Sequence, residues 1–561
     1  MGAIWNRLAR GDSSLAADAL RLLRVGSRTG LLWQQRPAGV LRTARILLHH
    51  PLGAGLIHAL NAGNAPSRLA VVDGSQSLTY GQMDARLSQL VHGLRSLGLG
   101  RGDRLALMAP NGWPYLLGFF GALRGGFAAV HVSYRLTAPE LRYILEHSGA
   151  RALLFDPRCL EAVKALMDAE PFRKLIFIAT SFMPDAPDVL TLEALLSGQP
   201  ESFPRSAKRL LAMPNLVYTS GTTGAPKGAV RDFARLSLPE LMRILDRLPF
   251  RAGERHLVVC PLYHSAAQAF VIFQAAGGST LVLLPRFDPE ETLRCLATER
   301  IDSVLLTPTM IRLILDLPEA VKARYRPGLR LRSLVSGAAP FPQPLREEAI
   351  EFFGEVVHDF YGSTEVGWTT LVGSKEMLER PSTVGRPIPG THIFILDDEG
   401  RPLPPGEVGE IFVTTQQRIE EYYRNAEATS GSRRGEAQAS GDLGWLDEAG
   451  YLFLAGRRSD LVISGGVNVY PSEIEQALVE HPAIREAAVL GVPDDKWGER
   501  VVAFLVGPKA AELPEIEAFC RERLAGFKVP KQWELREELP HNATGKVLKR
   551  LLKEELLGAK G

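Results

Sequence analysis

The stretch Tyr218-Thr-Ser-Gly-Thr-Thr-Gly-Ala-Pro-Lys-Gly-Ala-Val230 places four serine and threonine hydroxyls, three glycines and one lysine directly after an apolar lead-in. Glycines let the main chain approach an anion closely, N–H groups and hydroxyls donate hydrogen bonds to it, and lysine adds positive charge. The stretch is not a Walker A motif, because Gly228 follows Lys227 where that motif has a magnesium-binding Ser or Thr. Ser/Thr/Gly clusters are usually surface loops, but this spacing favours a phosphate-binding loop.

Around this loop, from about residue 65, short apolar runs alternate with segments of helical period. The runs predict buried strands at Leu105–Ala109, Ala152–Phe155, Leu175–Ile178, His256–Cys260, Thr280–Leu284, Ser303–Leu306 and Leu331–Val335. The periodic segments predict helices at Tyr80–Leu97, Tyr115–Leu123, Ala138–His147, Pro239–Leu248, Pro289–Glu299 and Gln343–Phe353. Alternation of this kind predicts parallel sheets covered on both faces by helices.

Residues 383–455 have a different pattern of apolar and turn residues. Short alternating stretches at His392–Leu396, Gly409–Thr414 and Tyr451–Leu454 are separated by turn residues such as Pro404-Pro405-Gly406. This pattern predicts antiparallel strands. The last hundred residues return to mixed strands and helices, and no internal repeat is present.

The composition is that of an ordinary globular protein. The chain has 561 residues, 45% hydrophobic and 23% charged, with a mean hydropathy of −0.01, which argues against a disordered or fibrous chain. The formal net charge of +2 is too balanced for a chain-wide nucleic-acid surface, so no nucleic-acid partner is expected. Four scattered cysteines without a CxxC pair predict neither a disulfide framework nor a zinc site, and a cytoplasmic location fits best.

Residues 1–60 form a basic, amphipathic segment. They contain eight arginines against two aspartates, a formal charge of +6, and the arginines interrupt every apolar cluster. No stretch therefore approaches a membrane-spanning helix. Two interpretations remain open: peripheral contact with an anionic membrane surface, or a helical collar packed on the main body. A third is a cleaved organelle transit peptide, since such peptides are also Arg-rich and acid-poor.

Seven sequence blocks, in order, carry a resemblance to a known family. After the loop at 218–230 come Ser336-Gly-Ala-Ala-Pro340, Tyr361-Gly-Ser-Thr-Glu365, Ser440-Gly-Asp442, Gly456-Arg-Arg-Ser-Asp460, Ser464-Gly-Gly-Val-Asn-Val-Tyr-Pro-Ser-Glu-Ile-Glu475 and Thr544-Gly-Lys546. Together they resemble the adenylate-forming superfamily of acyl-CoA synthetases, luciferases and peptide-synthetase adenylation domains. The chain is most similar to a fatty-acid–CoA ligase, and the resemblance spans roughly residues 65–550.

The resemblance implies an α/β fold in two parts. A large N-terminal domain, residues 61–456, would hold two α/β subdomains and a small β-barrel. A small, mobile α+β domain, residues 461–561, would follow a hinge at 457–460. The family joins a carboxylate to the α-phosphate of ATP, releasing pyrophosphate, and a thiol, usually of coenzyme A, then attacks the acyl-adenylate.

The resemblance also implies roles for individual residues in nucleotide binding. The phosphates would be held by Thr219, Ser220, Gly221, Thr222, Thr223, Gly224 and Lys227, and Glu365 would bind Mg²⁺, a hard cation that prefers carboxylate ligands. The nucleotide would further contact Gly337, Ala338, Ala339, Pro340, Asp359, Tyr361 and Gly362, with Tyr361 stacked on adenine. Thr364 would touch the α-phosphate, whereas Asp442 and Arg457 would contact the ribose; a carboxylate accepts both ribose hydroxyls well.

Other matches concern catalysis and the thiol step. Lys546 resembles the near-C-terminal lysine that bridges the carboxylate and the α-phosphate in the transition state. His264 matches a residue at the mouth of the acyl pocket, although a lone histidine is more often structural. Gly465 would face the pantetheine of coenzyme A. The chain departs from the family at Ser459, where the hinge commonly has Asp or Lys, and over Gln416–Ala439.

The substrate is expected to be a medium- or long-chain fatty acid. Apolar Phe270, Phe273 and Trp368 fall in the segments expected to line the acyl pocket, and no Asp or Lys is there to capture an amino acid. No carrier-protein domain follows, so a free-standing enzyme is expected. Two alternatives remain: an adenylate-forming enzyme whose second step is lactone formation or acyl transfer to a carrier protein, and a non-catalytic relative. The oligomeric state stays open.

Overall fold

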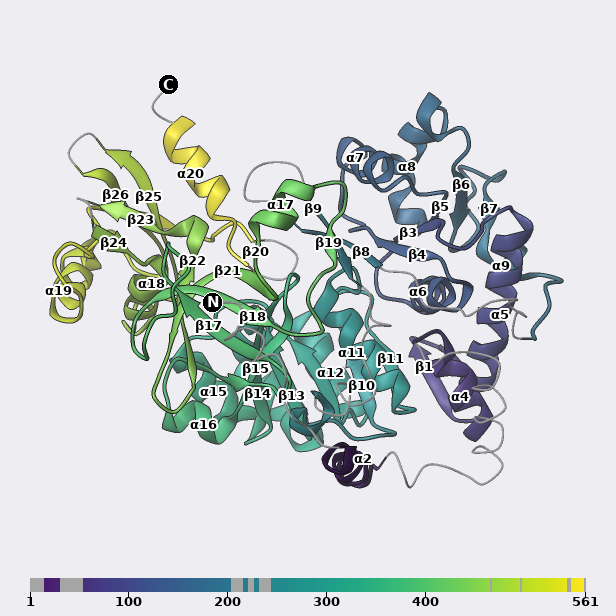
Figure 1. The fold of residues 1–561 in the computed structure, drawn as a ribbon, viewed down its shortest axis with the longest axis horizontal. Coiled ribbons are helices and arrows are strands. Elements are labelled where there is room, and N and C mark those ends of the chain that lie inside the picture. The colour runs from purple at the N-terminus through teal and green to yellow at the C-terminus, as the bar shows by residue number, and fades with distance from the viewer. Residues whose placement is uncertain are drawn as a thin grey trace. The chain divides into compact units, whose positions relative to one another are not determined.

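The computed structural model describes residues 15–30, 54–202, 215–219, 227–231, 244–464, 467–494, 497–541 and 546–558. The chain divides into two compact units, whose helices and strands are labelled in Figure 1. Unit 1 contains Met1–Leu306, Leu317–Val335 and Gln416–Ser432, and unit 2 contains Thr307–Asp316, Ser336–Thr415 and Arg433–Gly561. The hinge predicted at 457–460 lies inside unit 2 and stays a prediction.

The first sheet of unit 1 carries the predicted phosphate loop at its antiparallel end. Its strands, in spatial order, are β19 (Glu421–Tyr422), β9 (Lys227–Arg231), β8 (Asn215–Thr219), β4 (Ala128–His131), β3 (Arg104–Met108), β5 (Ala152–Phe155), β6 (Ile176–Ala179) and β7 (Leu190–Thr191). Pairing is parallel from β8 to β7, whereas β8–β9 and β9–β19 are antiparallel. The loop between β8 and β9 therefore opens at one end of a two-stranded hairpin.

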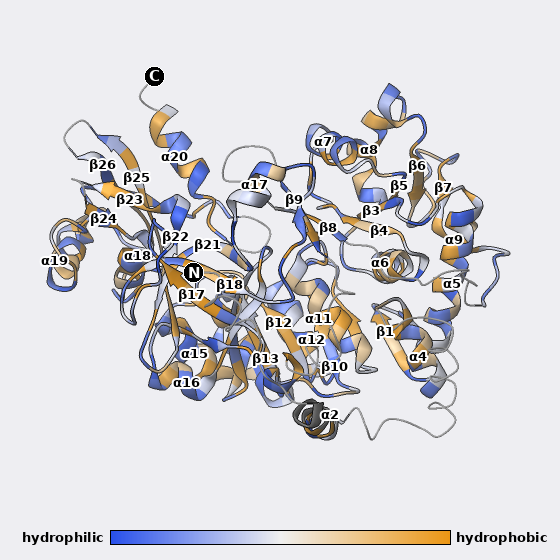
Figure 2. Ribbon diagram, viewed as in Figure 1, coloured by the Kyte–Doolittle hydropathy of each residue, from blue (hydrophilic) through white to orange (hydrophobic). Residues whose placement is uncertain are grey.

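A second sheet of unit 1 joins distant parts of the sequence. Here β10 (Arg255–Val258) lies between β11 (Thr280–Leu283) and β12 (Ser303–Leu306), and β11 pairs with β1 (Leu69–Asp73), which pairs with β2 (Gln76–Thr79). The helices of unit 1 are α4 (Ile57–Asn64), α5 (Tyr80–Ser96), α6 (Trp113–Gly125), α7 (Ala138–Ser148), α8 (Leu160–Met167), α9 (Leu192–Leu196), α11 (Ser265–Ala276), α12 (Pro289–Thr298), α14 (Glu319–Tyr325) and α17 (Ala426–Gly431). Figure 2 shows hydrophobic strands beside helices of mixed character, as expected where helices cover a sheet.

Most of the expected strands and helices are present within one or two residues of the predicted bounds. The predicted strand Ala152–Phe155 and the predicted helix Gln343–Phe353 have the same limits in the structure. Of the predicted helix Pro239–Leu248, residues 239–243 lie outside the described part of the chain, and residues 244–247 are helical. Capping chemistry explains several helix starts: Thr79 accepts a hydrogen bond from the main-chain N–H of Gln82, forming a capping box.

Unit 2 contains a run of antiparallel strands, and those within residues 383–455 confirm the prediction for that segment. In pairing order they are β14 (Val357–Ser363), β15 (Gly367–Gly373), β16 (Thr383–Pro387), β22 (Leu452–Arg457), β21 (Ala437–Leu446), β18 (Gly409–Thr414) and β17 (His392–Leu396). A buried cluster that includes Val366, Ile411, Val413 and Leu452 forms their core. Three helices belong to this part, α13 (Pro308–Leu315), α15 (Gln343–Phe353) and α16 (Ser374–Glu379), and the strand β13 (Ser333–Gly337) precedes α15.

The C-terminal part of unit 2 is a small α+β structure. Its strands are β23 (Val462–Ser464), β24 (Val467–Val469), β25 (Glu486–Asp494), β26 (Gly498–Val506) and β27 (Gln532–Arg536), and its helices are α18 (Pro471–Val479), α19 (Leu513–Arg523) and α20 (Lys549–Gly558). Alternate residues of β25 and β26 face two buried clusters, one containing Ala503 and Leu505 and the other Val502 and Phe504. The chain therefore has the expected fold class, mixed α/β with a small α+β part at its C-terminal end.

The helix α2 (Leu15–Thr29) packs on the body of unit 1. Arg24 forms an ion pair with Asp246, and the main-chain N–H of Ala252 donates to the carbonyl of Thr29 over 2.7 Å. Val25 is fully buried, whereas Leu20 and Leu23 are exposed. Residues 15–30 therefore match the helical-collar interpretation, and residues 31–53 lie outside the described ranges. Every helix in the described ranges is too short or too polar to span a membrane.

Candidate active site

Three side chains from three strands of unit 2 meet in one cluster. The Tyr361 hydroxyl, on β14, donates to Oδ2 of Asp442 on β21 over 2.8 Å. On the neighbouring strand β22, Arg457 pairs in register with Asp442, and its Nε lies 3.6 Å from Oδ1 of that carboxylate. Both oxygens of Asp442 thus face polar partners, and the Asp442 side chain is only 14% exposed. The cluster combines an aromatic ring, an oriented carboxylate and a cation, which suits a nucleoside.

The charges around Asp442 bring two further predicted residues to this cluster. Burial raises the pKa of Asp442, whereas Arg457, the Tyr361 hydroxyl and Lys546 lower it. Glu365, a like charge, raises that pKa as well. Coulombic coupling of this kind acts between neighbours, so Lys546 and Glu365 both lie near Asp442.

Lys546 is largely withdrawn from solvent at this position. Burial, and to a smaller extent Arg457, lowers the pKa of its amine to about 8, against the opposing effect of the carboxylates of Asp442 and Asp460. At neutral pH the side chain is therefore a mostly protonated ammonium with little hydration. A poorly hydrated ammonium stabilises developing negative charge strongly. Residues 542–545, which contain the predicted Thr544-Gly545 loop, lie outside the described part of the chain.

Gly362 and Glu365 belong to the turn between β14 and β15. A Cβ on Gly362 would lie 2.1 Å from the carbonyl oxygen of Gly367, so this position accepts only glycine. The strand register shifts between Tyr361 and Gly362, which marks a bulge. Thr364 and Glu365 follow at the hairpin tip, where the Glu365 N–H donates to the Ser363 hydroxyl over 3.2 Å. The bulge and the turn set the direction in which Glu365 leaves the sheet.

The turn at residues 337–340 follows β13. Gly337 is buried, and a Cβ there would lie 2.4 Å from the Phe360 ring. Ala338 adopts a positive φ of 67°, and it is exposed together with Pro340, whereas Ala339 is half-buried. The close Gly337–Phe360 contact therefore places this turn beside the strand that carries Tyr361.

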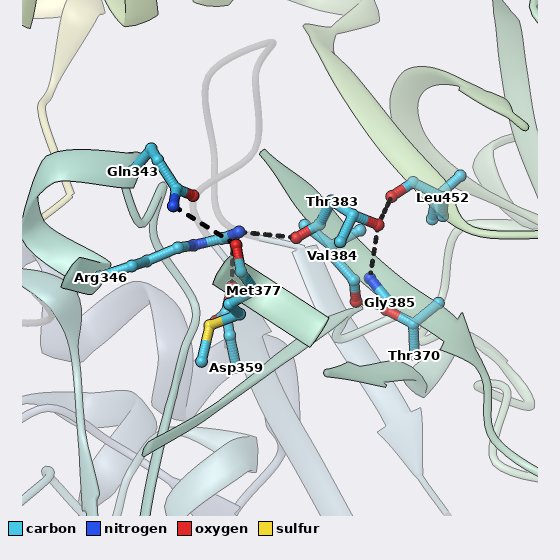
Figure 3. A network of polar contacts seen from close by, with 9 residues as sticks. All are labelled: Gln343, Arg346, Asp359, Thr370, Met377, Thr383, Val384, Gly385 and Leu452. Atoms are coloured by element: carbon cyan, nitrogen blue, oxygen red, sulfur yellow. Dashed lines mark hydrogen bonds and ion pairs between the residues drawn. The ribbon is translucent and has the colours of Figure 1, made fainter. Parts of the chain in front are cut away.

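Asp359 is held in the interior by Arg346, two residues before Tyr361 on β14. Arg346 Nη2 donates to Asp359 Oδ2 over 2.8 Å, and Nη1 donates to the carbonyl of Thr383 on β16 over 2.7 Å (Figure 3). The Thr383 hydroxyl in turn donates to the carbonyl of Leu452 on β22 over 2.9 Å. Burial raises the pKa of Asp359 to about 6, against the opposing effect of Arg346. The structure thus gives the Asp359 carboxylate a buried protein partner.

Arg346 is a residue that sequence reasoning missed. It lies three and four residues before Ala349 and Ile350, and all three share the buried face of α15. A charged residue on the apolar face of a predicted helix is a signal for a buried partner. No pattern in the sequence, however, identifies that partner as Asp359.

In unit 1, the predicted phosphate loop begins and ends on paired strands. Thr219, the last residue of β8, is in register with Lys227, the first residue of β9. Ser220, Gly221, Thr222, Thr223 and Gly224 lie between them, outside the described residues. The Lys227 amine lies 5.6 Å from the centre of the Tyr422 ring. The hairpin thus fixes where the loop starts and stops.

The segment around Tyr422 and Tyr423, where the sequence departs from the family, closes the edge of this hairpin. Tyr422 pairs with Ala229 as part of β19, and the Tyr423 N–H donates to the Gly228 carbonyl over 2.8 Å. The segment Gln416–Ala439, where the sequence departs from the family, thus contains a strand that pairs with β9. Sequence reasoning missed this pairing, because a two-residue strand has no period to detect.

His264 occupies the N-cap position of α11 in unit 1, without a capping hydrogen bond from its side chain. Its Nε2 is buried and has no hydrogen-bond partner among the described residues, and burial lowers the pKa of the imidazole to about 4. Asn111, a buried residue that the sequence did not single out, holds the preceding turn. Its amide donates to the carbonyl of Cys260 over 3.1 Å and accepts from the N–H of Leu262 over 2.9 Å. His264 is therefore a neutral imidazole that follows a main-chain turn held by Asn111.

Around the predicted hinge, Arg458 contacts two acids. Its guanidinium lies 2.7 Å from Glu410 Oε2 and 2.9 Å from Asp398 Oδ1. Ser459 follows, and its hydroxyl donates to the Asp460 carboxylate over 3.0 Å. Gly465, predicted to face coenzyme A, lies outside the described residues, between β23 and β24.

Two family models match the chain. The model described as "AMP-binding enzyme" matches residues 59–423, and "AMP-binding enzyme C-terminal domain" matches residues 473–546. The chain belongs to the AMP-binding enzyme family. This membership confirms the resemblance to adenylate-forming enzymes that the seven sequence blocks predict.

Relatives in this AMP-binding family differ in the acids and acceptors that their names give. The chain is 31% identical to a fatty acid–[acyl-carrier-protein] ligase, ScoC, of Streptomyces coeruleorubidus, over 91% of this chain and 98% of the relative. It is 34% identical to a feruloyl-CoA synthase of an Amycolatopsis species, over 89% of this chain and 98% of that relative. It is 31% identical to the long-chain-fatty-acid–CoA ligase FadD13 of Mycobacterium tuberculosis, over 85% of this chain and 93% of that relative.

A solved structure supports the fold of this AMP-binding enzyme. The anthranilate CoA ligase AuaEII, in complex with anthranoyl-AMP, superposes with a TM-score of 0.83 at 26% identity. The superposition covers 91% of this chain and 98% of that one. The mixed α/β fold is therefore that of adenylate-forming enzymes.

Proposed function

We propose that the chain is an acyl-CoA synthetase that activates a medium- or long-chain fatty acid with ATP and transfers the acyl group to coenzyme A. The observation that carries this proposal is the cluster of Tyr361, Asp442 and Arg457 with the buried ammonium of Lys546 beside it. Tyr361 and Asp442 supply a ring for adenine and an acceptor for the ribose hydroxyls. Lys546 supplies the charge that the first reaction step needs.

In that step two anions must meet. A carboxylate oxygen of the acid attacks the α-phosphorus of ATP, the bond from that phosphorus to the β-bridging oxygen breaks, and pyrophosphate leaves with the electron pair. The reactants repel each other, so positive charge and fixed geometry matter more than an acid–base pair. Lys546 would stand between the carboxylate and the α-phosphate. Its weak hydration means that little solvent is displaced when the transition state forms.

The β- and γ-phosphates would be held by the loop after β8. Thr219, Ser220, Thr222 and Thr223 would donate hydroxyl hydrogen bonds, Gly221 and Gly224 would let the main chain approach, and Lys227 would add charge. Thr364 would contact the α-phosphate. Asp359, held by Arg346, would act by placing Tyr361.

Glu365 is the acidic residue that the sequence resemblance implies for Mg²⁺. In the part of the chain that the structure describes, no group of three or more His, Cys, Asp or Glu side chains gathers as a metal site. Mg²⁺ usually takes one or two carboxylates and completes its shell with water and substrate phosphates. Glu365, at the tip of the β14–β15 hairpin, is the carboxylate that would hold it. When bound, the ion would neutralise the phosphate charge.

In the second step the sulfur of coenzyme A attacks the acyl carbon. The carbon–oxygen bond to AMP breaks, AMP leaves as the anion, and the thiol proton passes to solvent. Rotation at residues 457–460 would withdraw Lys546 and bring Gly465 to the pantetheine. Ser459 and Arg458, with its contacts to Glu410 and Asp398, would set the cost of that rotation.

The choice of a fatty acid is supported by the names of two relatives. FadD13 is named for long-chain fatty acids with coenzyme A, and ScoC for fatty acids with a carrier protein. Leu20 and Leu23, exposed on α2, would rest on an anionic membrane from which such acids partition. If Leu20→Glu with Leu23→Glu sediments with anionic vesicles as well as the wild type does, this membrane contact is wrong.

Acyl transfer to a carrier protein is the second candidate, because the relative ScoC is named for it. Mass spectrometry of reactions with ATP, magnesium, coenzyme A and acids of graded chain length tests both. Acyl-CoA formed together with AMP, best with a medium or long acid, supports the proposal. Acyl-adenylate formed without a thioester would favour a carrier protein as the acyl acceptor. A preference for ferulate or anthranilate would overturn the fatty-acid assignment.

A further inference from the structure

His541 lies five residues before Lys546, and its imidazole contacts the first residue of β25. Nε2 of His541 is 2.6 Å from Oε1 of Glu486. The two side chains are 26% and 33% exposed. The contact is thus near the surface, where a polar substitution does not leave a charge fully buried.

The main chain around His541 is joined to the main chain around Lys546. His541 and Val547 form an antiparallel bridge, and the N–H of Leu548 donates to the carbonyl of Pro540 over 2.7 Å. Lys546 directly precedes Val547. The position of His541 is therefore transmitted to the backbone next to the lysine.

A second contact fixes the other side of Lys546. Lys549, at the start of α20, lies 2.6 Å from Oε1 of Glu475 on α18. That same carboxylate oxygen accepts the N–H of Val489, on β25, over 2.7 Å. The chain before Lys546 is thus attached to β25 through Glu486, a residue of that strand. The chain after Lys546 is attached to β25 through Glu475 of α18, which bonds to Val489 of the strand.

We propose that His541, held by Glu486, is a positioning residue that places the Lys546 ammonium for acyl-adenylate formation. This inference rests on the role of Lys546 in the proposed function. Lys546 is enclosed near Asp442, Arg457 and Asp460, so its amine tolerates little displacement. An error of about 1 Å in the placement of a reacting group costs on the order of a hundredfold in rate.

The charges around His541 favour its protonated form. The carboxylate of Glu486 raises the pKa of the imidazole most, the carbonyl of Leu539 and the carboxylate of Glu538 also raise it, and burial opposes them. A charged pair is a stronger hydrogen bond than a neutral one. The anchor therefore weakens as the imidazole loses its proton with rising pH.

The experiment separates the two half-reactions in the full-length chain. ATP–pyrophosphate exchange with decanoic acid measures adenylation, and transfer from synthetic decanoyl-adenylate to coenzyme A measures thioester formation. His541→Gln and Glu486→Gln should lower the kcat of exchange by roughly tenfold to a hundredfold and leave transfer unchanged. His541→Arg should restore most of the exchange, because arginine keeps a charged bond to Glu486. Arg550→Gln is the matched control, since it removes the Arg550–Glu554 ion pair of α20 and should change neither rate.

The pH profile of exchange gives a second readout. Wild-type exchange should contain a decline as His541 loses its proton with rising pH, in addition to the loss near pH 8 from Lys546, and His541→Arg should lack the His541 decline. If both Gln variants match the wild type in exchange, or if exchange and transfer fall together, the inference is wrong. If the wild type shows no exchange with any acid, the proposed function fails instead. Should His541→Gln not fold, Glu486→Gln carries the same test.

Discussion

The hydroxyl of Tyr361 donates to Oδ2 of Asp442 over 2.8 Å, and this bond joins β14 to β21 where Asp442 pairs with Arg457. We expect Tyr361→Phe to raise the KM for ATP about tenfold, because hydrogen bonds to charged groups contribute about 1.5–3 kcal/mol. The ring is retained, so stacking on adenine is kept and kcat should change less. Steady-state kinetics with ATP varied checks this, with Tyr325→Phe on α14 as the control. An unchanged KM would remove Asp442 from the ribose site.

Lys546 should matter for one half-reaction only. Lys546→Ala is expected to lower ATP–pyrophosphate exchange by about a hundredfold or more, and to leave transfer from a preformed acyl-adenylate intact. Because burial lowers the pKa of this amine to about 8, the protonated form is lost as pH rises through that value. Wild-type exchange should therefore fall above about pH 8. In Lys546→Arg the residual exchange should lack this fall, since arginine stays charged.

Full exchange activity in Lys546→Ala would contradict the assignment of this lysine. A wild-type profile that stays flat well above pH 8 would contradict its burial. These two outcomes are independent of each other. The first tests whether the Lys546 side chain takes part in adenylation, and the second tests whether burial lowers the pKa of its amine.

Gly362 should not accept a side chain. A Cβ there would lie 2.1 Å from the carbonyl oxygen of Gly367, so Gly362→Ala must open the bulge of the β14–β15 hairpin that leads to Glu365. We expect loss of measurable ATP binding by calorimetry together with a lower melting temperature. Gly431→Ala is the control, since a Cβ at Gly431 meets nothing within 4 Å. ATP binding by Gly362→Ala at wild-type affinity would show that the bulge is not required.

The sequence predicted much of the fold because burial leaves a local, periodic signal. Strands such as Ala152–Phe155 are short apolar runs, and the helix Gln343–Phe353 repeats its apolar positions every three or four residues. Asp442 and Lys546 were identified by the neighbours that accompany them in short motifs. In each case the information lies within a few residues of the feature.

The residues that sequence reasoning missed depend on partners far along the chain. Tyr422 pairs with Ala229 of β9, and Glu486 with His541, through contacts between separate elements. A local pattern shows that a residue is buried or polar, but not which distant backbone or side chain meets it. Arg346 is the clearest case: its place on the apolar face of α15 was visible, whereas Asp359 and Thr383 as its partners were not.

The buried pair of Arg346 and Asp359 gives the last prediction, which concerns stability. Removing one partner of a buried ion pair leaves the other charge uncompensated and costs about 3–5 kcal/mol, whereas replacing both with apolar residues is often neutral. We therefore expect Arg346→Met to be strongly destabilised in urea, and Arg346→Met combined with Asp359→Leu to recover most of the loss. If the double variant is no more stable than the single one, the pair is not the source of the effect.

The same pair predicts how stability depends on pH. Burial raises the pKa of Asp359 from 3.8 to about 6, so between these values the folded chain binds more protons than the unfolded chain. Folding stability from this group is therefore present below about pH 4 and is lost as pH rises through about 6. Without Arg346, which lowers that pKa, the loss should extend to higher pH. Urea midpoints of Arg346→Met should thus be nearer the wild type at pH 5 than at pH 8, and equal differences at both pH values would show that Asp359 is not the titrating group.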